Sequence, residues 1–451
     1  MFEFVWNLLS FVIALGILVT AHEYGHYWVA KKNNVRVLRF SVGFGKAIWR
    51  RVDKEGTEFV VSIIPLGGYV RMLDERVDDV LPSEKHLAFN NKSVYQRIAI
   101  IAAGPGANFL FALVAFYFMF MIGVPSVKPV TGTIVEKSIA GQAGMTDKLE
   151  IISIAGDKTA TWSAVNLALV SQIGEPSIAI EARSTDSVST QVYQLDTRSW
   201  KFDPDKSNVI ASLGLAPYRT EIYTELAVIA DDSAGKRAGL QAGDLIVSAN
   251  GIDVRNKWNE FSKIIQENPN NEVAISVERK GELLSLFATP GEMKSDEGTR
   301  GYLGVSPKTA PYPQEYLFDE QFGPIAAIGK SFERTWQLIV LSFEMIGKLI
   351  TGDVSVKNLG GPISMAEGAG TSAGFGFVYF LGFLAFISIN LGIINILPLP
   401  VLDGGHLVYY LIELLTGKPV PEKVQEAGFK FGALALLCIM SIAILNDLSR
   451  L

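Results

Sequence analysis

Two histidines and a glutamate near the start of the chain, His22, Glu23 and His26, form a His-Glu-x-x-His motif. On a helix, His22 and His26 lie one turn apart on the same face, and two imidazoles at that spacing can bind one zinc ion. Glu23 then lies beside the metal, where its carboxylate can accept a proton from water. The motif ends an apolar run that begins near Phe4, and ionisable side chains at membrane depth usually mark a function. The motif therefore predicts a zinc protease whose active site lies inside a membrane.

A zinc hydrolase needs a third protein ligand and an open position for water. The candidates follow a later apolar run, where Asp403 and His406 stand close together. Imidazole is the commoner ligand, but Asp403 also fits, and its pairing with Gly404 is equally typical of a turn at a helix end. His86 stands in a polar loop and is a weaker candidate. The chemistry of the residues leaves the choice between Asp403 and His406 open.

The composition limits the class of protein. The chain has 451 residues, of which 49% are hydrophobic, and a net charge of −6. This length predicts about three domains. Cys438 is the single cysteine, which excludes a disulfide-stapled secreted protein. The modest negative charge gives no indication of a nucleic-acid partner.

Four apolar runs are long enough to span a bilayer, whose hydrocarbon core requires about 20 mainly apolar residues. They cover residues 4–30, 98–122, 376–398 and 428–446. The first run could instead be a cleaved signal peptide. It starts with Glu3 rather than with a basic cluster, and its polar end carries the His-Glu pair, so a membrane span is the better interpretation.

Other segments are assigned around these runs. Gly104–Asn108 interrupts the second span, and Asn108 can form a hydrogen bond across helices. Simple packing explains that segment at least as well as a catalytic role. Residues 325–350 have an amphipathic helical pattern, too charged to span and suited to the membrane surface. Residues 399–427 are expected to be a loop.

The loop at residues 31–97 indicates the orientation. Its beginning is basic, with seven lysines and arginines before the first acidic residue, and such loops face the cytoplasm. The metal motif then lies in the cytoplasmic half of the membrane. Four spans place both termini and the domain between the second and third spans outside, in the periplasm of a Gram-negative cell. The 399–427 loop is not basic, so the orientation depends on the first loop alone.

The same loop contains a predicted β-hairpin. Residues 59–64 form a strand candidate, the turn-prone segment Pro65–Gly68 follows it, and residues 39–45 are its expected partner. An ordinary cytoplasmic hairpin would account for this pattern.

An internal repeat occupies residues 126–308. Ser138–Met145 aligns without gaps to Ser233–Leu240, and a tryptophan follows each copy at a similar distance. Two tandem domains of similar fold are therefore expected. Residues 238–251 resemble a bacterial, circularly permuted PDZ domain, a fold that binds peptides by adding a strand to a sheet edge. The first copy has Lys148-Leu149 where the second has a Gly-Asp pair, so peptide binding and a steric size filter are equal interpretations.

Two motifs together resemble a known family. His-Glu-Tyr-Gly-His in the first span and Asn-x-x-Pro-x-Pro-x-Leu-Asp-Gly over residues 395–404 are similar to those of the site-2 protease family of intramembrane zinc metalloproteases. The resemblance covers nearly the whole chain.

The expected fold class is a multi-domain membrane protein, with a four-span α-helical core, a membrane re-entrant β element and two tandem PDZ-like α+β domains. The predicted domains are the first span with its metal motif (1–30), a cytoplasmic loop with the β element (31–97), the second span (98–124), the first PDZ-like domain (125–220), the second PDZ-like domain (221–308), a linker with the surface helix (309–374), the third span with the second motif (375–406), and a cytoplasmic loop with the fourth span (407–451).

The resemblance also implies roles for individual residues. It implies Zn²⁺ as cofactor, His22, His26 and Asp403 as its ligands, and Glu23 as general base. It further implies a substrate that lies as a strand along the β element. The substrate-binding positions that it implies are Asn395, Asn390, Gly43 and Ile63.

The implied substrates are single-span membrane proteins in the bacterial inner membrane. They include an anti-sigma factor already cut by a first protease, in a stress response, and remnant signal peptides. The lipid bilayer and peptide C-termini at the PDZ-like domains are the other expected partners. A membrane-anchored PDZ adaptor without protease activity is the alternative, and it would bind without zinc. A metal or ion transporter would need more polar residues within the spans than the chain has.

Overall fold

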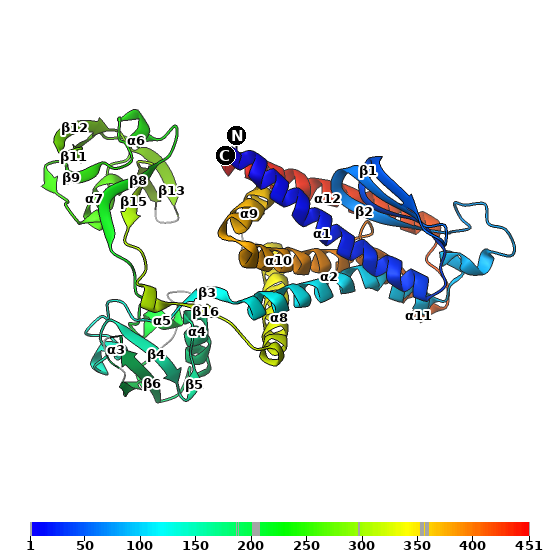
Figure 1. The fold of residues 1–451 in the computed structure, drawn as a ribbon, viewed down its shortest axis with the longest axis horizontal. Coiled ribbons are helices and arrows are strands. Elements are labelled where there is room, and N and C mark those ends of the chain that lie inside the picture. Colours follow the sequence, from blue (N-terminus) through cyan, green and yellow to red (C-terminus); the bar gives the residue numbers. More distant parts are fainter. Residues whose placement is uncertain are drawn as a thin grey trace. The chain divides into compact units, whose positions relative to one another are not determined.

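The computed structural model describes residues 2–185, 187, 189–200, 208–295, 298–351, 356 and 360–450. The chain divides into two compact units (Figure 1). The helical unit comprises Met1–Val124 and Asp319–Leu451, and the sheet unit comprises Pro125–Phe318. Part of the glycine-rich segment before Pro362 lies outside the described residues.

Four long helices dominate the helical unit. Within the described residues, these four are long and apolar enough to span a membrane. Only 11–33% of the most apolar stretch of each is buried within the protein, so most of this surface requires an apolar environment. The four long helices correspond to the four predicted spans. They are α1 (Phe2–Lys32), α2 (Val94–Ile122), α10 (Phe377–Ile396) and α12 (Glu422–Arg450).

The expected interruption of the second span is wrong, because α2 continues through Pro105. The helix starts at a capping box formed by Ser93 and Gln96, which satisfies the first backbone amides. The small residues of this segment serve close packing instead. A Cβ atom on Gly25 of α1 would lie 2.2 Å from the carbonyl oxygen of Ala103, so α1 and α2 touch through their backbones.

Within its described residues, the unit has three further α-helices. The amphipathic helix predicted at 325–350 is α8 (Pro324–Thr351), but α9 (Pro362–Phe375) was not expected. The expected loop at 399–427 is wrong in part, because it contains α11 (Asp403–Thr416).

The third span, predicted at residues 376–398, is α10. α10 stops at Ile396 because Pro398 and Pro400 follow. The chain then turns tightly into α11, and a Cβ on Gly404 would lie 2.2 Å from the carbonyl oxygens of Ile396 and Leu397. Asp403 therefore occupies the first turn of a new helix and not the end of the span.

A bent β-hairpin follows α1, where the sequence predicts one. β1 (Val37–Val52) and β2 (Glu58–Met72) each contribute two segments to one sheet. One outer edge of this sheet is residues 68–72, and no further strand pairs with it among the described residues. The segments lie in the order 47–52, 58–62, 37–42 and 68–72.

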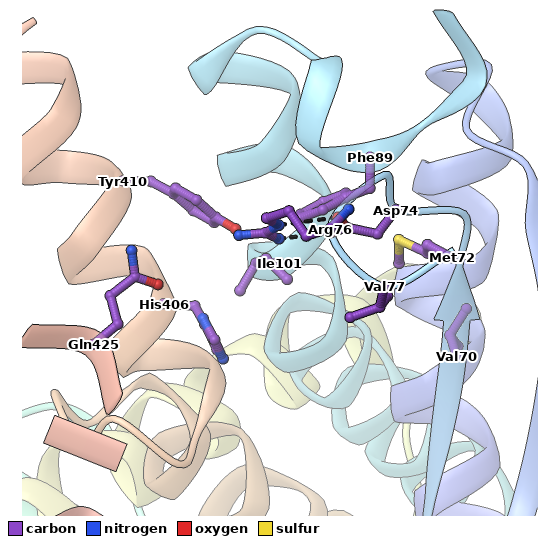
Figure 2. Close-up of a pocket in the computed structure, with 10 residues that line it drawn as sticks. All are labelled: Val70, Met72, Asp74, Arg76, Val77, Phe89, Ile101, His406, Tyr410 and Gln425. Atoms are coloured by element: carbon purple, nitrogen blue, oxygen red, sulfur yellow. Dashed lines mark hydrogen bonds and ion pairs between the residues drawn. The ribbon is translucent and has the colours of Figure 1, made fainter. Parts of the chain in front are cut away.

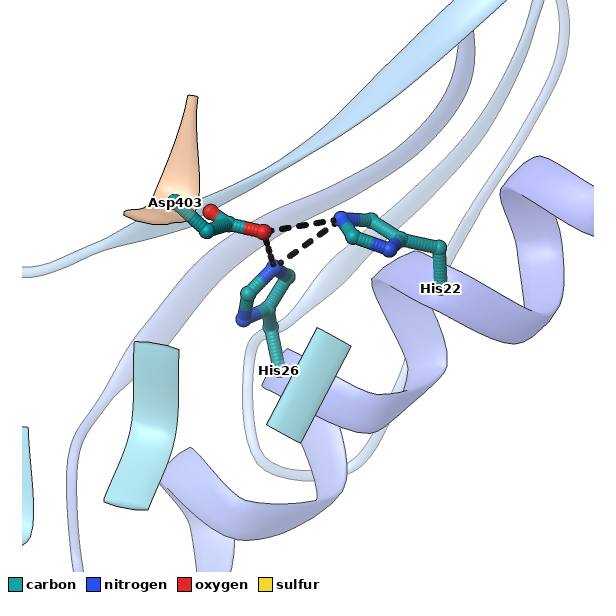
Figure 3. Close-up of side chains that lie close together, drawn as sticks. All are labelled: His22, His26 and Asp403. Carbon is teal, nitrogen blue, oxygen red and sulfur yellow. Dashed lines mark hydrogen bonds and ion pairs between the residues drawn. The ribbon is translucent and has the colours of Figure 1, made fainter. Parts of the chain in front are cut away.

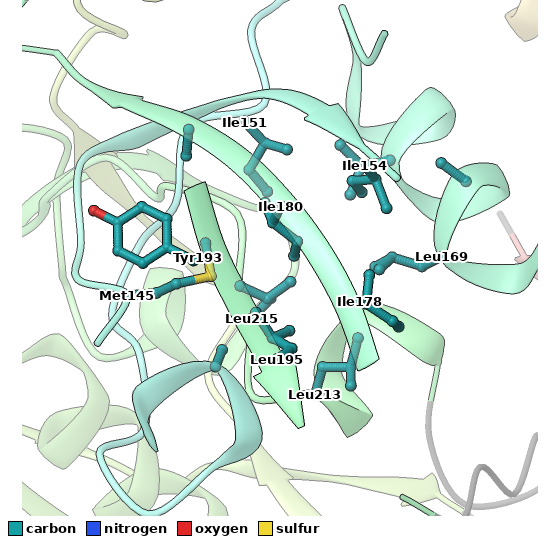
Figure 4. Close-up of a cluster of buried hydrophobic side chains, with 14 of the residues drawn as sticks. Met145, Ile151, Ile154, Leu169, Ile178, Ile180, Tyr193, Leu195, Leu213 and Leu215 are labelled. Carbon is teal, nitrogen blue, oxygen red and sulfur yellow. The ribbon is translucent and has the colours of Figure 1, made fainter. Parts of the chain in front are cut away.

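The first half of the sheet unit is a four-stranded sheet in the order β5-β4-β6-β7. Its core is formed by alternate strand residues, among them the fully buried Ile151, Ile180 and Leu195 (Figure 4). The strands are β4 (Leu149–Ile154), β5 (Asp157–Lys158), β6 (Ser177–Ser184) and β7 (Thr190–Asp196), and the helices are α3 (Ile139–Gln142), α4 (Trp162–Ser171) and α5 (Val209–Ser212).

The second half repeats this order of elements. Ser138 and Ser233 cap equivalent short helices, since each hydroxyl accepts a hydrogen bond from the backbone three residues later. Trp162 and Trp258 begin equivalent longer helices. The sequence repeat is therefore also a structural repeat. The elements are β8 (Ile222–Ile229), α6 (Ala234–Arg237), β9 (Leu245–Ala249), β10 (Ile252–Asp253), α7 (Trp258–Gln266), β11 (Val273–Arg279), β12 (Glu282–Ala288), β13 (Gly291–Ser295), β14 (Gly298–Tyr302) and β15 (Val305–Thr309); β3 (Val124–Val127) and β16 (Leu317–Glu320) lie where the chain passes between the units.

A buried carboxylate in the second half has an apolar counterpart in the first. In the second half Asp244 is 1% exposed and accepts two hydrogen bonds from the guanidinium of Arg279, at 2.6 and 2.8 Å. In the first half the aligned residue is the buried, apolar Leu149. Burial alone would raise the pKa of the Asp244 carboxyl, but hydrogen bonds from Arg279 and from the backbone of Gln241 hold that pKa below its ordinary value.

Candidate metal centre

Three side chains from the two ends of the chain converge in the helical unit. His22 Nε2 lies 3.1 Å from Asp403 Oδ2, and His26 Nε2 lies 3.3 Å from the same oxygen (Figure 3). The two Nε2 atoms are 3.3 Å apart. Among the described residues, this is the one cluster of histidine, cysteine or acidic side chains whose atoms converge as metal ligands do. The helical period of α1 aligns the histidines, and the first turn of α11 brings the carboxylate.

The donor set and its spacing fit zinc. Ligand atoms about 2.0–2.2 Å from a tetrahedral zinc ion lie about 3.3–3.6 Å from one another, close to the distances found here. Asp403 Oδ2 is also buried without a hydrogen-bond partner within the described part of the chain. A buried carboxylate oxygen without a donor is costly, and a cation between the three atoms would stabilise it.

His26 is held in the form that leaves Nε2 free to bind a metal. Its Nδ1 lies 2.8 Å from the carbonyl oxygen of Ile100 on α2. A carbonyl can only accept a hydrogen bond, so Nδ1 carries a proton, and in the neutral ring Nε2 then carries the lone pair. His22 has a different neighbour, because its Nδ1 lies 3.0 Å from the side-chain amide of Asn108.

Gly104 on α2 provides the space for the imidazole rings. A Cβ on this residue would lie 2.3 Å from His26 Nε2 and 2.8 Å from His22 Cε1. Any larger residue would therefore displace the rings. The sequence left packing and a catalytic role both open for this segment and did not predict the space that Gly104 provides. The available signal was the spacing of Gly104 four residues before Asn108, on the same helical face.

Glu23 is placed between the cluster and the hairpin. It is 8% exposed, and its carboxylate interacts electrostatically with the two histidines and with Asp403. A Cβ on Gly68, at the edge of β2, would lie 2.9 Å from the Glu23 Cγ atom. A chain bound along that edge would therefore pass close to this carboxylate.

The remaining histidines do not join the cluster. His86 is exposed on a short 3₁₀ turn, Lys85–Leu87. His406 lies on α11 beside a pocket of about 330 Å³, which Val70 and Met72 of β2 also line (Figure 2). Of the two candidates for the third ligand, only Asp403 is brought to the two histidines.

A part-buried ion pair positions α11 against α2. Arg97 donates a hydrogen bond to Glu413 at 2.7 Å, and both side chains are about one-seventh exposed. The Arg97 guanidinium also lies 4.8 Å from the centre of the Tyr410 ring. This pair holds the helix that carries Asp403.

The four residues expected to bind substrate lie in different surroundings. Asn390 is engaged in the protein: its amide nitrogen donates to Phe386 O, and its oxygen accepts from Ser342 Oγ. Asn395 is half-buried in the last turn of α10, and its side chain forms no hydrogen bond within the described part of the chain. Gly43 and Ile63 lie near the bend of the hairpin, and neither belongs to the metal cluster.

Comparison with known proteins identifies the family. Residues 10–439 match peptidase family M50. The regulator of sigma-E protease RseP of Escherichia coli (strain K12) is 49% identical over 451 residues, and the match covers 100% of both chains. Protease RseP of Yersinia pestis is 49% identical over 452 residues, and a Vibrio cholerae protein with the provisional name of zinc metalloprotease is 47% identical over 453 residues, each again with 100% of both chains covered. The resemblance predicted from the two motifs is thus confirmed: the chain belongs to peptidase family M50 and is a metalloprotease of the site-2 type.

Proposed function

We propose that this protein is a zinc-dependent protease that hydrolyses peptide bonds within the membrane-spanning segments of other proteins. The observation that carries the proposal is the meeting of His22, His26 and Asp403 beside a buried Glu23. Both histidines and Glu23 lie on a helix of membrane-spanning length, and Asp403 begins the shorter α11. His22, His26 and Asp403 would hold the metal. Zinc bound there would supply a Lewis acid that polarises the scissile carbonyl and makes water more acidic.

Glu23 is the proposed general base. Its carboxylate would accept a proton from the attacking water and deliver it to the leaving nitrogen. His26 keeps its orientation through Ile100, and Asp403 keeps its place through the first turn of α11. These residues thus act by holding the reacting groups in position while the glutamate moves the proton.

The substrate is proposed to bind as an extended strand. A membrane helix hides its amides in its own hydrogen bonds, so it must unwind before water can attack. The free edge at residues 68–72 can accept an unwound segment by strand addition, and it passes close to Glu23. The pocket between this edge and α11, lined by Val70, Met72 and His406, would take a substrate side chain (Figure 2).

Among the residues first expected to bind substrate, Asn395 fits this role best. Its amide is available for a hydrogen bond to an extended backbone, whereas the amide of Asn390 already bonds to Phe386 and Ser342. Gly43 and Ile63 belong to the bend of the same sheet and would support the edge.

The native substrate is proposed to be a single-span membrane protein. Relatives of this chain are named regulators of sigma-E, which favours an anti-sigma factor already cut by another protease, and remnant signal peptides are further candidates. The basic loop after α1 supports an inner-membrane orientation with the cluster in the cytoplasmic half and with the termini and sheet unit in the periplasm. The two repeats of the sheet unit are proposed to be PDZ-like domains that exclude bulky substrates or bind peptide C-termini.

Cleavage of a single-span model substrate by the detergent-purified full chain tests the function. We expect the wild type to cleave and Glu23→Gln to be inactive, with about one zinc per chain in both, because the glutamate is not a ligand. Glu3→Gln is the matched control, since it makes the same change at the far end of the same helix. Robust cleavage by Glu23→Gln would overturn the role of the base. A wild type without zinc that binds substrate and never cleaves it would favour an adaptor.

A further inference from the structure

Asn108 is a fully buried polar side chain beside the metal cluster. It lies on α2 with an exposed fraction of 0%, and its amide nitrogen is 3.0 Å from His22 Nδ1. Its Oδ1 is buried and has no hydrogen-bond partner within the described part of the chain. A buried polar group that is only partly satisfied generally has a specific reason.

The ligand chemistry of His22 determines what Asn108 must do. Nε2 of His22 faces Nε2 of His26 and Oδ2 of Asp403, so this nitrogen needs its lone pair to bind a cation. A neutral imidazole then carries its proton on Nδ1. The partner of Nδ1 must therefore accept a hydrogen bond, which an amide NH₂ group cannot do and an amide oxygen can.

The two ends of a side-chain amide have the same shape, so a half-turn about its terminal bond exchanges them without moving any neighbour. After this turn Oδ1 of Asn108 faces Nδ1 of His22. In either orientation one end of the Asn108 amide has a hydrogen-bond partner and the other has none, so the number of hydrogen bonds does not favour one orientation. The requirement of His22 for a protonated Nδ1 favours the orientation in which Oδ1 faces it.

We infer that Asn108 is a positioning residue: its Oδ1 accepts a hydrogen bond from Nδ1–H of His22 and so keeps Nε2 of His22 free for zinc. This inference rests on the proposed zinc site. The arrangement parallels that of His26, whose Nδ1 donates to Ile100 O. Ile100, Gly104 and Asn108 follow one another at intervals of four residues and share one face of α2. This face thus supplies an acceptor for each histidine, with room for the rings between them.

Zinc affinity measures this role directly. We expect Asn108→Leu, which has a similar size and no acceptor, to weaken zinc binding by about 10–100-fold, the usual effect of removing such a hydrogen bond. Asn108→Asp keeps an acceptor and should bind zinc at least as tightly as wild type. The measurement is competition with a chelator in the detergent-purified full chain, with the visible spectrum of the cobalt-loaded protein as a second readout.

A matched control separates this effect from packing. Ser388 Oγ, also 0% exposed, donates to the backbone oxygen of Asn108 at 2.9 Å and does not touch the histidines. Ser388→Ala should lower the melting temperature and leave zinc affinity unchanged. Should Asn108→Leu fail to fold, Asn108→Ala replaces it with the same expected direction.

Two outcomes would overturn the inference. One is wild-type zinc affinity in Asn108→Leu or Asn108→Ala. The other is a loss in Asn108→Asp as large as that in Asn108→Leu, because an aspartate can only accept. A wild type that binds no zinc would instead overturn the proposed function itself, so the two failures are distinguishable.

Discussion

His22 Nε2 and Asp403 Oδ2 lie 3.1 Å apart, although the two residues stand near opposite ends of the chain. The contact joins the first membrane-length helix to a helix that starts after the third. Two lone-pair atoms at this distance repel each other unless a proton or a cation lies between them. The contact therefore makes metal binding and the packing of α11 dependent on each other.

Asp403→Ala should reduce the zinc content well below one ion per chain, because it removes one of three protein ligands. His406→Ala should retain zinc, since His406 lies outside the ligand cluster. Metal analysis of the two purified variants, side by side, measures the difference. Full zinc in Asp403→Ala together with loss in His406→Ala would reverse the assignment.

Gly104→Ala should weaken zinc binding by at least about 10-fold, because the new methyl group would lie 2.3 Å from His26 Nε2 and displace the ring. Gly106→Ala is the control on the same helix, where a Cβ meets no atom within 4 Å. That control should bind zinc normally. Equal affinities in the two variants, measured by chelator competition, would contradict the tight fit around the rings.

Asp447→Ala should lower the free energy of unfolding by about 2 kcal/mol, the upper end for the loss of a helix cap. Asp447, on α12 and 2% exposed, accepts hydrogen bonds from the backbone of Gly361 and Ile363 and from Ser364 at the start of α9. Thermal unfolding in detergent measures the effect. Ser449→Ala, which removes an exposed bond within α12, serves as control and should leave the melting temperature nearly unchanged.

The ion pair of Asp244 and Arg279 should make the second repeat sensitive to acid. A carboxyl whose pKa is lower in the folded than in the unfolded state stabilises the fold above its unfolded pKa, about 4. This contribution is lost as the pH falls through the folded pKa. We therefore expect Asp244→Asn to destabilise the repeat near neutral pH and to differ less from wild type in acid.

Hydrogen exchange of the β9 and β11 amides in the full chain measures this difference. The variant and the wild type are compared at each pH, so that the pH dependence of the chemical exchange rate cancels. The first repeat, with Leu149 at the aligned position, is the internal control and should respond equally in both proteins. A variant effect that stays constant from neutral to acid pH would show that the carboxylate charge is not the cause.

Deletion of residues 126–308 should permit cleavage of substrates that still carry a large outer domain, if the sheet unit acts as a size filter. The assay compares such a substrate with one already shortened, for the deletion protein and for wild type. Glu23→Gln in the deletion background controls for contaminating proteases. If the shortened substrate is cut and the intact one stays resistant after the deletion, the filter proposal fails.

Patterns that repeat along the chain predicted much of the fold. The four long helices, the amphipathic helix α8 and the hairpin appear where hydrophobic length and periodicity place them. The repeat around Ser138 and Ser233 recurs as two similarly built halves of the sheet unit. A helix or strand that buries one face repeats apolar residues at the period of that element, so the pattern can be recognised in the sequence.

Local patterns failed where tertiary contacts decide the structure. Gly104 and Pro105 resemble helix breakers, yet α2 continues because the helices packed against it hold this segment helical. α9 was missed because its N-terminus is capped by Asp447, which is distant in sequence. The register of the bent hairpin, which exposes the edge at 68–72, was also not predictable from alternation alone.

The sequence by itself determined the identity and spacing of His22, Glu23 and His26, because a helix fixes the relation of residues four apart. Together with the motif at residues 395–404, it also identified the family. The chemistry of the residues left Asp403 and His406 open, and the family resemblance implied Asp403. Only the tertiary structure brought the Asp403 carboxylate to the histidines and placed Gly104 and Asn108 against them. The physical reason is distance along the chain: contacts between remote segments depend on how whole helices pack, and no local spacing encodes that packing.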